Sequence, residues 1–121
     1  MMIRVILSLL ALFLSVQSAF PLDVPYLAGR VNDLAGIMTG AKVNELEKTL
    51  RDFEKKTSCQ VAVLTVKSLE GENIEQYSIK VAEAWKLGQK GKDNGVLFLV
   101  SPGDRRMRIE VGYGLEGTLT D

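Results

Sequence analysis

Apolar residues recur along the middle of the chain at the spacing of an amphipathic helix. Between residues 39 and 56, four of them lie three or four positions apart: Val43, Leu46, Leu50 and Phe53. A second stripe of the same kind begins at Ile74, includes Trp85 and ends near Gly88. Such one-sided stripes predict two helices that each bury one face. Thr39 is a suitable N-cap for the first.

Three other runs have the composition of strands. Residues 60–66 and 96–100 are almost continuously apolar, as in strands that are covered on both faces, whereas residues 107–111 alternate. The first two runs are separated by a whole helix, which favours parallel pairing through a crossover. The short turn over residues 102–106 favours an antiparallel hairpin between the last two.

These elements predict an α/β fold, a three-layer α/β/α sandwich with a mixed, mostly parallel, Rossmann-like sheet. Ahead of them, residues 26–31 are a candidate short strand or arm, and residues 32–36 read as a turn. Residues 118–121 look like the start of a further helix. We therefore expect this chain to cover one sheet face poorly. Either the domain is truncated at its C-terminus or a partner covers that face.

Residues 1–19 have the pattern of an export signal. Arg4 precedes an apolar run over residues 5–16, and a small polar region allows cleavage near Ser18 or Ala19. The alternative is an uncleaved anchor, although a bilayer span needs roughly 20 apolar residues. We expect a protein exported to the periplasm, the cell envelope or the medium, with residues 20–121 as its one folded domain.

Composition narrows the chemistry that this domain can perform. The 121 residues include 15 Lys and Arg against 15 Asp and Glu, so the formal net charge is zero and nucleic acid is not an expected partner. There is no histidine, which excludes a Ser-His-Asp triad and His-ligated zinc. The single cysteine, Cys59, cannot form an internal disulfide, and no neighbour in the sequence would activate its thiol.

Carboxylates in loops are the remaining candidates for a functional site. Four of them stand out: Asp33, Asp93, Glu116 and Asp121. Asp33 and Asp93 would meet if their loops lie at the same edge of the sheet, with the other two joining from the end of the returning strand. Such carboxylates can bind Ca²⁺ or Mg²⁺, and the bound ion can polarise a phosphoryl oxygen and activate water. Alternatively, each Asp serves its own turn.

Four blocks of the sequence also resemble a known family, the TPM domain proteins. The blocks are residues 27–36 (LAGRVNDLAG), 60–66 (QVAVLTV), 84–95 (AWKLGQKGKDNG) and 108–121 (RIEVGYGLEGTLTD). Members of that family include thylakoid-lumen phosphatase-like proteins, a photosystem II repair factor and a receptor modulator, and many bacterial members are exported. The resemblance implies an α/β/α sandwich and an acidic cluster for a divalent cation, which carries onto Asp33, Asp93, Glu116 and Asp121.

The resemblance leaves two functions open. Some members are phosphatases, which implies an exported enzyme that hydrolyses phosphomonoesters at a bound Ca²⁺ or Mg²⁺, with water as the nucleophile. Others are assembly or modulatory factors, which implies a non-catalytic module with a structural cation. The expected partner is then an envelope or membrane protein, and bacterial members are often membrane-associated through a segment beyond the position of Asp121.

Overall fold

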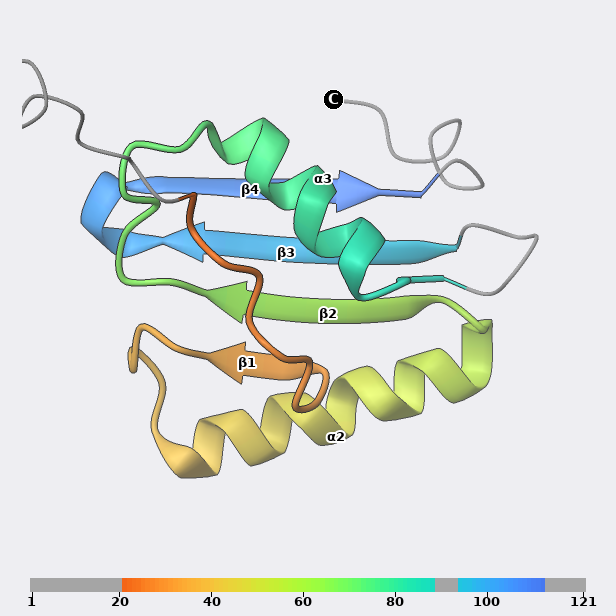
Figure 1. The fold of residues 1–121 in the computed structure, drawn as a ribbon. Coiled ribbons are helices and arrows are strands. Elements are labelled where there is room, and N and C mark those ends of the chain that lie inside the picture. Colours follow the sequence, from red (N-terminus) through yellow and green to blue (C-terminus); the bar gives the residue numbers. More distant parts are fainter. Residues whose placement is uncertain (1–20, 89–93, 113–121) are drawn as a thin grey trace, which may run out of the picture.

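The computed structural model describes residues 21–88 and 94–112, which form a four-stranded sheet with helices packed against it (Figure 1). The elements follow in the order β1 (Val31–Asp33), α2 (Gly40–Thr57), β2 (Gln60–Thr65), α3 (Ile74–Ala84), β3 (Gly95–Ser101), the 3-10 helix η1 (Pro102–Asp104) and β4 (Arg106–Val111). The predicted export signal, residues 1–19, lies outside the described residues and stays a prediction.

The strands lie in the order β1-β2-β3-β4. β1 and β3 are both parallel to β2, with Val31 opposite Val63 and Val61 opposite Val96. β4 returns antiparallel to β3, with Ile109 opposite Phe98. The predicted mixed, mostly parallel sheet is therefore confirmed, including its C-terminal hairpin.

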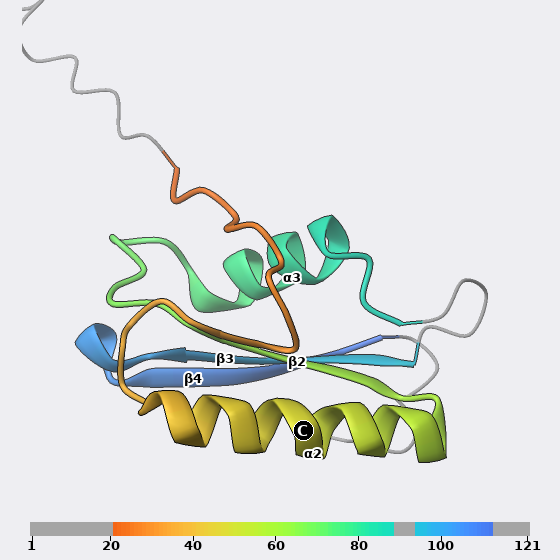
Figure 2. The same ribbon diagram turned by 90° about the horizontal axis from the view of Figure 1, so that it is seen from below.

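The two helices lie on opposite faces of this sheet, so the predicted three-layer arrangement is also confirmed. Figure 2 shows α3 and the extended lead-in chain on one side and α2 on the other. Because the strand order advances in one direction from β1 to β3, the two crossovers have opposite hands, and one of them departs from the usual right-handed connection. No helix of the described residues is long and apolar enough to span a membrane.

The main hydrophobic core lies between the sheet and α3. Alternate residues of β2 and β3 point toward this helix, whose own stripe meets them. The buried apolar members are Ala62, Leu64, Val66, Leu69, Ile74, Tyr77, Val81, Trp85, Leu97 and Leu99. Since apolar burial contributes about 25 cal/mol per Å² removed from water, this layer dominates the stability of the fold.

Two aromatic side chains tie the lead-in chain to this core. The Tyr77 hydroxyl donates to the Asp23 carbonyl at 3.0 Å, and the Trp85 indole N–H donates to the Pro25 carbonyl at 2.8 Å. Burial raises the pKa of Tyr77 to about 12, so the phenol stays protonated and remains a donor. Trp85 is thus a core anchor, as its place on the helical stripe predicts.

The α2 side of the sheet is covered less completely. The apolar stripe of α2 faces β1 and β2, yet the helix has no fully buried residue. Over β3 and β4, Met107 is 59% exposed and Ile109 49% exposed, and Phe53 of α2 is 44% exposed. Within the described residues, this is the poorly covered face that the sequence led us to expect.

Helix α3 ends earlier than its apolar stripe predicts. The pattern extends to about Gly88, whereas the helix ends at Ala84. Lys86 has a φ of 50° and Gly88 a φ of 100°, both in the left-handed region. The chain therefore leaves the helix in a tight turn that brings Leu87 and Gly88 directly against the start of β3.

The close approach at this turn makes Gly95 a sensitive position. A Cβ on Gly95 would lie 2.4 Å from the carbonyl carbon of Leu87 and 2.5 Å from the nitrogen of Gly88, and neither backbone atom can move alone. We expect Gly95→Ala to lower the free energy of unfolding by about 1–3 kcal/mol, measured by urea denaturation. Gly40→Ala is the matched control, since nothing lies within 4 Å of its added Cβ. An equal loss in both variants would contradict this account.

Candidate functional site

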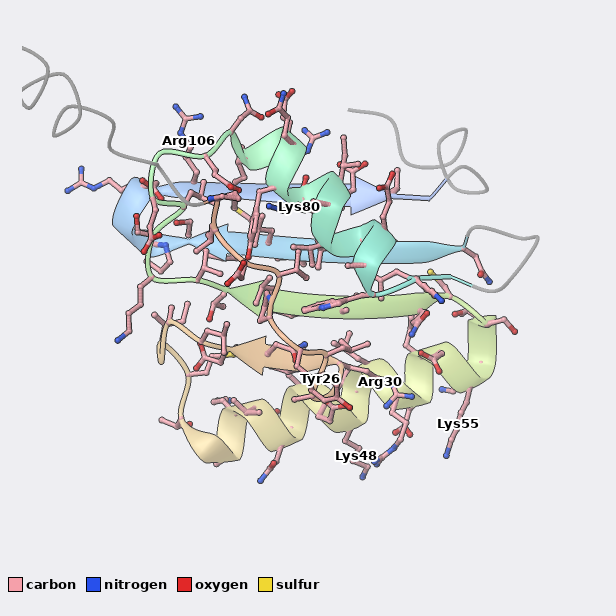
Figure 3. All side chains as sticks on the ribbon, viewed as in Figure 1. Tyr26, Arg30, Lys48, Lys55, Lys80 and Arg106 are labelled. Atoms are coloured by element: carbon pink, nitrogen blue, oxygen red, sulfur yellow. The ribbon has the colours of Figure 1, made fainter. Side chains whose placement is uncertain are left out.

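Asp33 is the last residue of β1, and this three-residue strand is held in place by α2. The Glu47 carboxylate accepts hydrogen bonds from the backbone N–H groups of Arg30 at 3.0 Å and Val31 at 2.8 Å. The Arg30 guanidinium forms ion pairs with Glu47 at 3.4 Å and Glu54 at 3.1 Å. Figure 3 shows Arg30 between β1 and α2. Glu47 of the helix therefore bonds directly to the backbone of β1 at Val31.

Glu47 is stabilised as an anion in this position. Burial raises the pKa of Glu47, but the hydrogen bonds from the backbone of Arg30 and Val31 and the nearby guanidinium outweigh burial, so the pKa is lowered overall. A Cβ on Gly29 would lie 3.1 Å from Glu47 Oε2. The glycine thus leaves room for the carboxylate beside the strand.

The preceding residue, Asn32, fixes β1 to its neighbours on the other side. Its side-chain oxygen accepts from the Ala28 N–H at 3.0 Å, and its amide nitrogen donates to the carbonyls of Gly29 at 2.9 Å and Val63 at 3.2 Å. The prediction of a turn over residues 32–36 was therefore wrong for Asn32 and Asp33, which belong to β1. Pairing with β2 and these side-chain hydrogen bonds satisfy groups that a local turn would otherwise use.

The Asp33 carboxylate closes the loop that connects β1 to α2. Its Oδ1 accepts from the Thr65 hydroxyl at 2.6 Å and from the Ile37 N–H at 3.2 Å, and its Oδ2 accepts from the Met38 N–H at 2.9 Å. Thr65 Oγ1 accepts in turn from the Ala35 N–H at 3.0 Å. The result is a connected set of hydrogen bonds between β1, β2 and the loop.

The electrostatics of Asp33 follow from these donors. Burial raises its pKa, but the hydrogen bonds from Thr65, Met38 and Ile37 lower it by more, so the carboxylate is ionised at neutral pH. Three donors already point at its two oxygens. This is the turn-forming role that the sequence left open as the alternative to metal binding.

The other three predicted ligands lie outside the described residues: Asp93, Glu116 and Asp121. Asn94, the chain neighbour of Asp93, is described and precedes β3, and Gly112, the last described residue, follows β4; β3 begins and β4 ends at the opposite edge of the sheet from Asp33 (Figure 1). Asp33 is level with Thr65 and Val100, where the parallel strands end, whereas Gly95 is where β3 begins. Asp33 therefore lies at the opposite end of the parallel strands from Gly95.

At that opposite edge of the sheet, the start of β3 lies beside the end of β4. The Gly112 N–H donates to the Gly95 carbonyl at 2.9 Å, so the chain before β3 and the chain after β4 leave the sheet side by side. The Asn94 carbonyl accepts from the Gln60 N–H at 3.0 Å. These hydrogen bonds extend the sheet up to Asn94 and Gly112. Asn94 follows directly on Asp93, and Gly112 precedes the segment that contains Glu116 and Asp121.

A hollow of about 480 Å³ opens at the same edge, between α3 and the β3–β4 hairpin. Leu97 is fully buried in its wall, while Glu83 and Lys86 line it as exposed charged side chains. Gly95 and Gly112 contribute backbone to the lining. An apolar wall with a few charged groups is typical of small-molecule pockets.

Asp104 is a carboxylate of structural importance that the sequence analysis did not single out. Its Oδ2 accepts from the Leu69 N–H at 2.7 Å and from the Ser101 hydroxyl at 2.7 Å. These hydrogen bonds lower the pKa of Asp104 and fasten the β3–β4 turn to the loop before α3. The Ser-Pro-Gly-Asp sequence signals a turn. The hydrogen bond between Asp104 and Leu69, 35 residues away, has no local signal in the sequence.

Neither a metal cluster nor an activated thiol is present in the part of the chain that the structure describes. No three His, Cys, Asp or Glu residues of residues 21–88 and 94–112 are grouped so that they could hold a metal ion. Burial raises the pKa of the Cys59 thiol, and the charge of Glu54 adds to the effect. Cys59 therefore lacks the electropositive surroundings of a nucleophilic cysteine.

Both the sequence and the fold are similar to those of known proteins. A family model described as the TPM domain matches residues 31–121. The solved N-terminal domain of a P. gingivalis protein is 33% identical with a TM-score of 0.73, and the match covers 82% of this chain and 66% of that one. An N-terminal domain from Corynebacterium glutamicum, 16% identical with a TM-score of 0.61, has the same fold over 81% of this chain and 64% of its own. A comparison with curated proteins gives no match.

The hydrogen bonds of Asp33 predict a pH-dependent loss of stability on its removal. We expect Asp33→Asn to lower the free energy of unfolding by about 1–3 kcal/mol at pH 7, because the amide cannot accept from all three donors. Since the folded-state pKa is lowered, the contribution of the carboxylate is fully present above its unfolded pKa of about 4 and is lost as the pH falls through the folded-state value.

The measurement is urea denaturation of both proteins between pH 7 and about pH 2. The stability gap should close as the pH falls. Asp52→Asn is the matched control, because Asp52 is exposed on α2 and a surface substitution should change stability by no more than about 0.5 kcal/mol. A gap that stays constant over the whole range would show that the carboxylate charge is not the cause.

Proposed function

The chain belongs to the TPM domain family, and from this premise we propose that it binds a divalent cation, Ca²⁺ or Mg²⁺, at the edge where β3 begins and β4 ends. The proposed ligands are Asp93, Glu116 and Asp121. The observation that carries the proposal is the 2.9 Å hydrogen bond from the Gly112 N–H to the Gly95 carbonyl. It brings together the starting points of the two segments that carry these carboxylates.

Covalent geometry limits how far each ligand lies from this edge. Asp93 is bonded to Asn94, so their Cα atoms are about 3.8 Å apart. Glu116 is four residues beyond Gly112, which allows a separation of up to about 14 Å. Asp121 has a longer tether. These limits allow all three carboxylates to reach one ion at the oxygen–metal distances of about 2.0–2.6 Å that Mg²⁺ and Ca²⁺ require.

We leave Asp33 out of the proposed ligand set. It is level with Thr65, whereas Gly95 is level with Gln60 at the other end of β2. Five residue steps along a strand correspond to about 16 Å, which is too far for two carboxylates to share one ion.

The finer part of the proposal is hydrolysis of a phosphomonoester at this edge. The cation would supply polarisation of a phosphoryl oxygen and of the attacking water. Water is the proposed nucleophile, because the chain has no histidine and the Cys59 thiol is not activated. The hollow beside α3 is of a size to hold the organic part of such a substrate, and its charged lining consists of Lys86 and the carboxylates of Glu83 and Glu110.

A second candidate is a non-catalytic binding or assembly module of the cell envelope, in which the cation is structural. It is favoured by the exposed apolar side chains Met107 and Ile109 on the sheet face, which suit contact with a protein partner in the envelope or membrane. In both candidates the protein is exported, as the pattern of residues 1–19 indicates.

Calorimetric titration of Ca²⁺ and of Mg²⁺ into the folded protein tests the cation site. We expect saturable binding that Asp93→Asn weakens by at least about tenfold, because a carboxylate ligand is lost. Asp52→Asn and Asp33→Asn should bind as the unmodified protein does, the latter with reduced stability. Loss of binding in Asp33→Asn, in a protein still folded by circular dichroism, would place Asp33 in the site. No binding in the unmodified protein would refute the proposal.

Hydrolysis of p-nitrophenyl phosphate separates the two candidates. If the domain is a phosphatase, turnover should depend on the added cation, cease with chelator and fall by at least about tenfold in Asp93→Asn while Asp52→Asn stays active. Cation binding without turnover by the unmodified protein would favour the binding module.

A further inference from the structure

Strand β4 forms an outer edge of the sheet whose second side has no strand partner among residues 21–88 and 94–112. In an antiparallel ladder, every second residue directs its N–H and C=O toward the neighbouring strand. The Gly112 N–H bonds to the Gly95 carbonyl, and the β3–β4 register continues from that pair. The backbone groups of Met107, Ile109 and Val111 therefore point outward.

The two faces of β4 differ in chemistry. Met107, Ile109 and Val111 lie opposite Val100, Phe98 and Val96 on the α2 side of the sheet, and the first two are largely exposed. On the α3 side, Glu110 accepts from the Ser78 hydroxyl at 3.3 Å and pairs with Arg108 at 3.2 Å. The edge is thus apolar on one face, and on the other it carries Arg106 at its start and the oppositely charged Arg108 and Glu110 near its middle.

We propose that β4 is an interaction surface for a second copy of this chain, paired antiparallel about a two-fold axis at Ile109. In this register each Ile109 faces the same residue of the second copy, and the two exchange both backbone hydrogen bonds. Each Met107 faces Val111 of the second copy on the apolar side. Each Arg108 faces Glu110 of the second copy on the other side, so that two opposite-charge pairs form.

The charges select this register over its neighbours that keep the same backbone pairing. An axis at Met107 would place Arg106 opposite Arg108 twice. An axis at Arg108 would place Arg106 opposite Glu110 twice but would bring the two Arg108 side chains together at its centre. An axis at Glu110 would bring the two Glu110 carboxylates together. Like charges directly opposite one another destabilise a sheet and opposite charges stabilise it. The Ile109 register is the one among these four that has opposite-charge pairs and no like-charge pair.

The dimer would also resolve two exposed features of the fold. The outward backbone groups of β4, which have no strand partner among the described residues, would be satisfied, and the sheets of the two copies would join edge to edge. The half-exposed Met107 and Ile109 would be covered by apolar side chains of the same strand in the second copy. Both changes favour association through the same six-residue segment, Arg106–Val111.

The test is an exchange of charges between two variants, measured by sedimentation equilibrium. R108E makes the side chains at positions 108 and 110 both acidic, and E110R makes both of them basic. Each variant alone has two like-charge pairs in its homodimer, so we expect its dissociation constant to rise by at least about tenfold. Mixed one to one, the two variants should form a heterodimer about as tight as the original dimer, because every pair then has opposite signs.

K48E is the control for a charge reversal away from the edge, since Lys48 is exposed on α2 (Figure 3). It should dimerise as the unmodified protein does, and circular dichroism should show all variants folded. A protein that stays monomeric to millimolar concentration overturns the proposal, and the apolar edge then belongs to another partner. The proposal is also overturned if the single variants dimerise unchanged, or if both are weakened but form no heterodimer, since the internal Arg108–Glu110 pair would then explain the effect.

Discussion

The contact of the Glu47 carboxylate with the backbone of β1 is the interaction on which one half of this fold depends. β1 has three residues and, in the part of the chain that the structure describes, one strand neighbour, so pairing with β2 alone holds it weakly. Glu47 accepts the backbone N–H groups of Arg30 and Val31, and the guanidinium of Arg30 bridges Glu47 and Glu54. Because α2 has no fully buried residue, this polar connection does much of what apolar packing does for α3.

The position of β1 then determines what Asp33 can do. With Asn32 and Val31 fixed, the carboxylate meets the Thr65 hydroxyl and the N–H groups of the following loop. Asp104 does the same at the end of β3, where it binds Ser101 and the backbone of Leu69. At this edge of the sheet, ionised carboxylates serve to close loops. The carboxylates that we propose for the cation belong to segments that leave the sheet at the other edge.

The sequence predicted those parts of the fold that depend on local spacing. The cap at Thr39, the stripes of both helices and the antiparallel hairpin all follow from residues that are close in the chain. What it missed depends on partners far apart in the chain: Glu47 lies 16 positions from Val31, and Thr65 lies 32 positions from Asp33. The turn predicted at Asn32 failed for this reason, because the strand supplied hydrogen bonds that no pattern of neighbours reveals. The same distance explains why four acidic residues looked like one site, although Asp33 is separated from the neighbours of Asp93 by the length of β2.

The two outer strands of the sheet show how differently an exposed edge can be treated. At β1, the Glu47 carboxylate of α2 accepts the N–H of Val31 in the strand and that of Arg30 just before it. At β4, the charged side chains are on the strand itself: Arg108 pairs with Glu110, and Glu110 accepts from the Ser78 hydroxyl. None of these contacts uses the outward backbone groups of Met107, Ile109 and Val111, which are available to another strand. Charge on an edge strand usually opposes association. Arg108 and Glu110 are placed symmetrically about Ile109, so in the proposed dimer their charges disfavour the other registers instead. The same charges that would oppose non-specific pairing then favour one partner, a second copy of the chain.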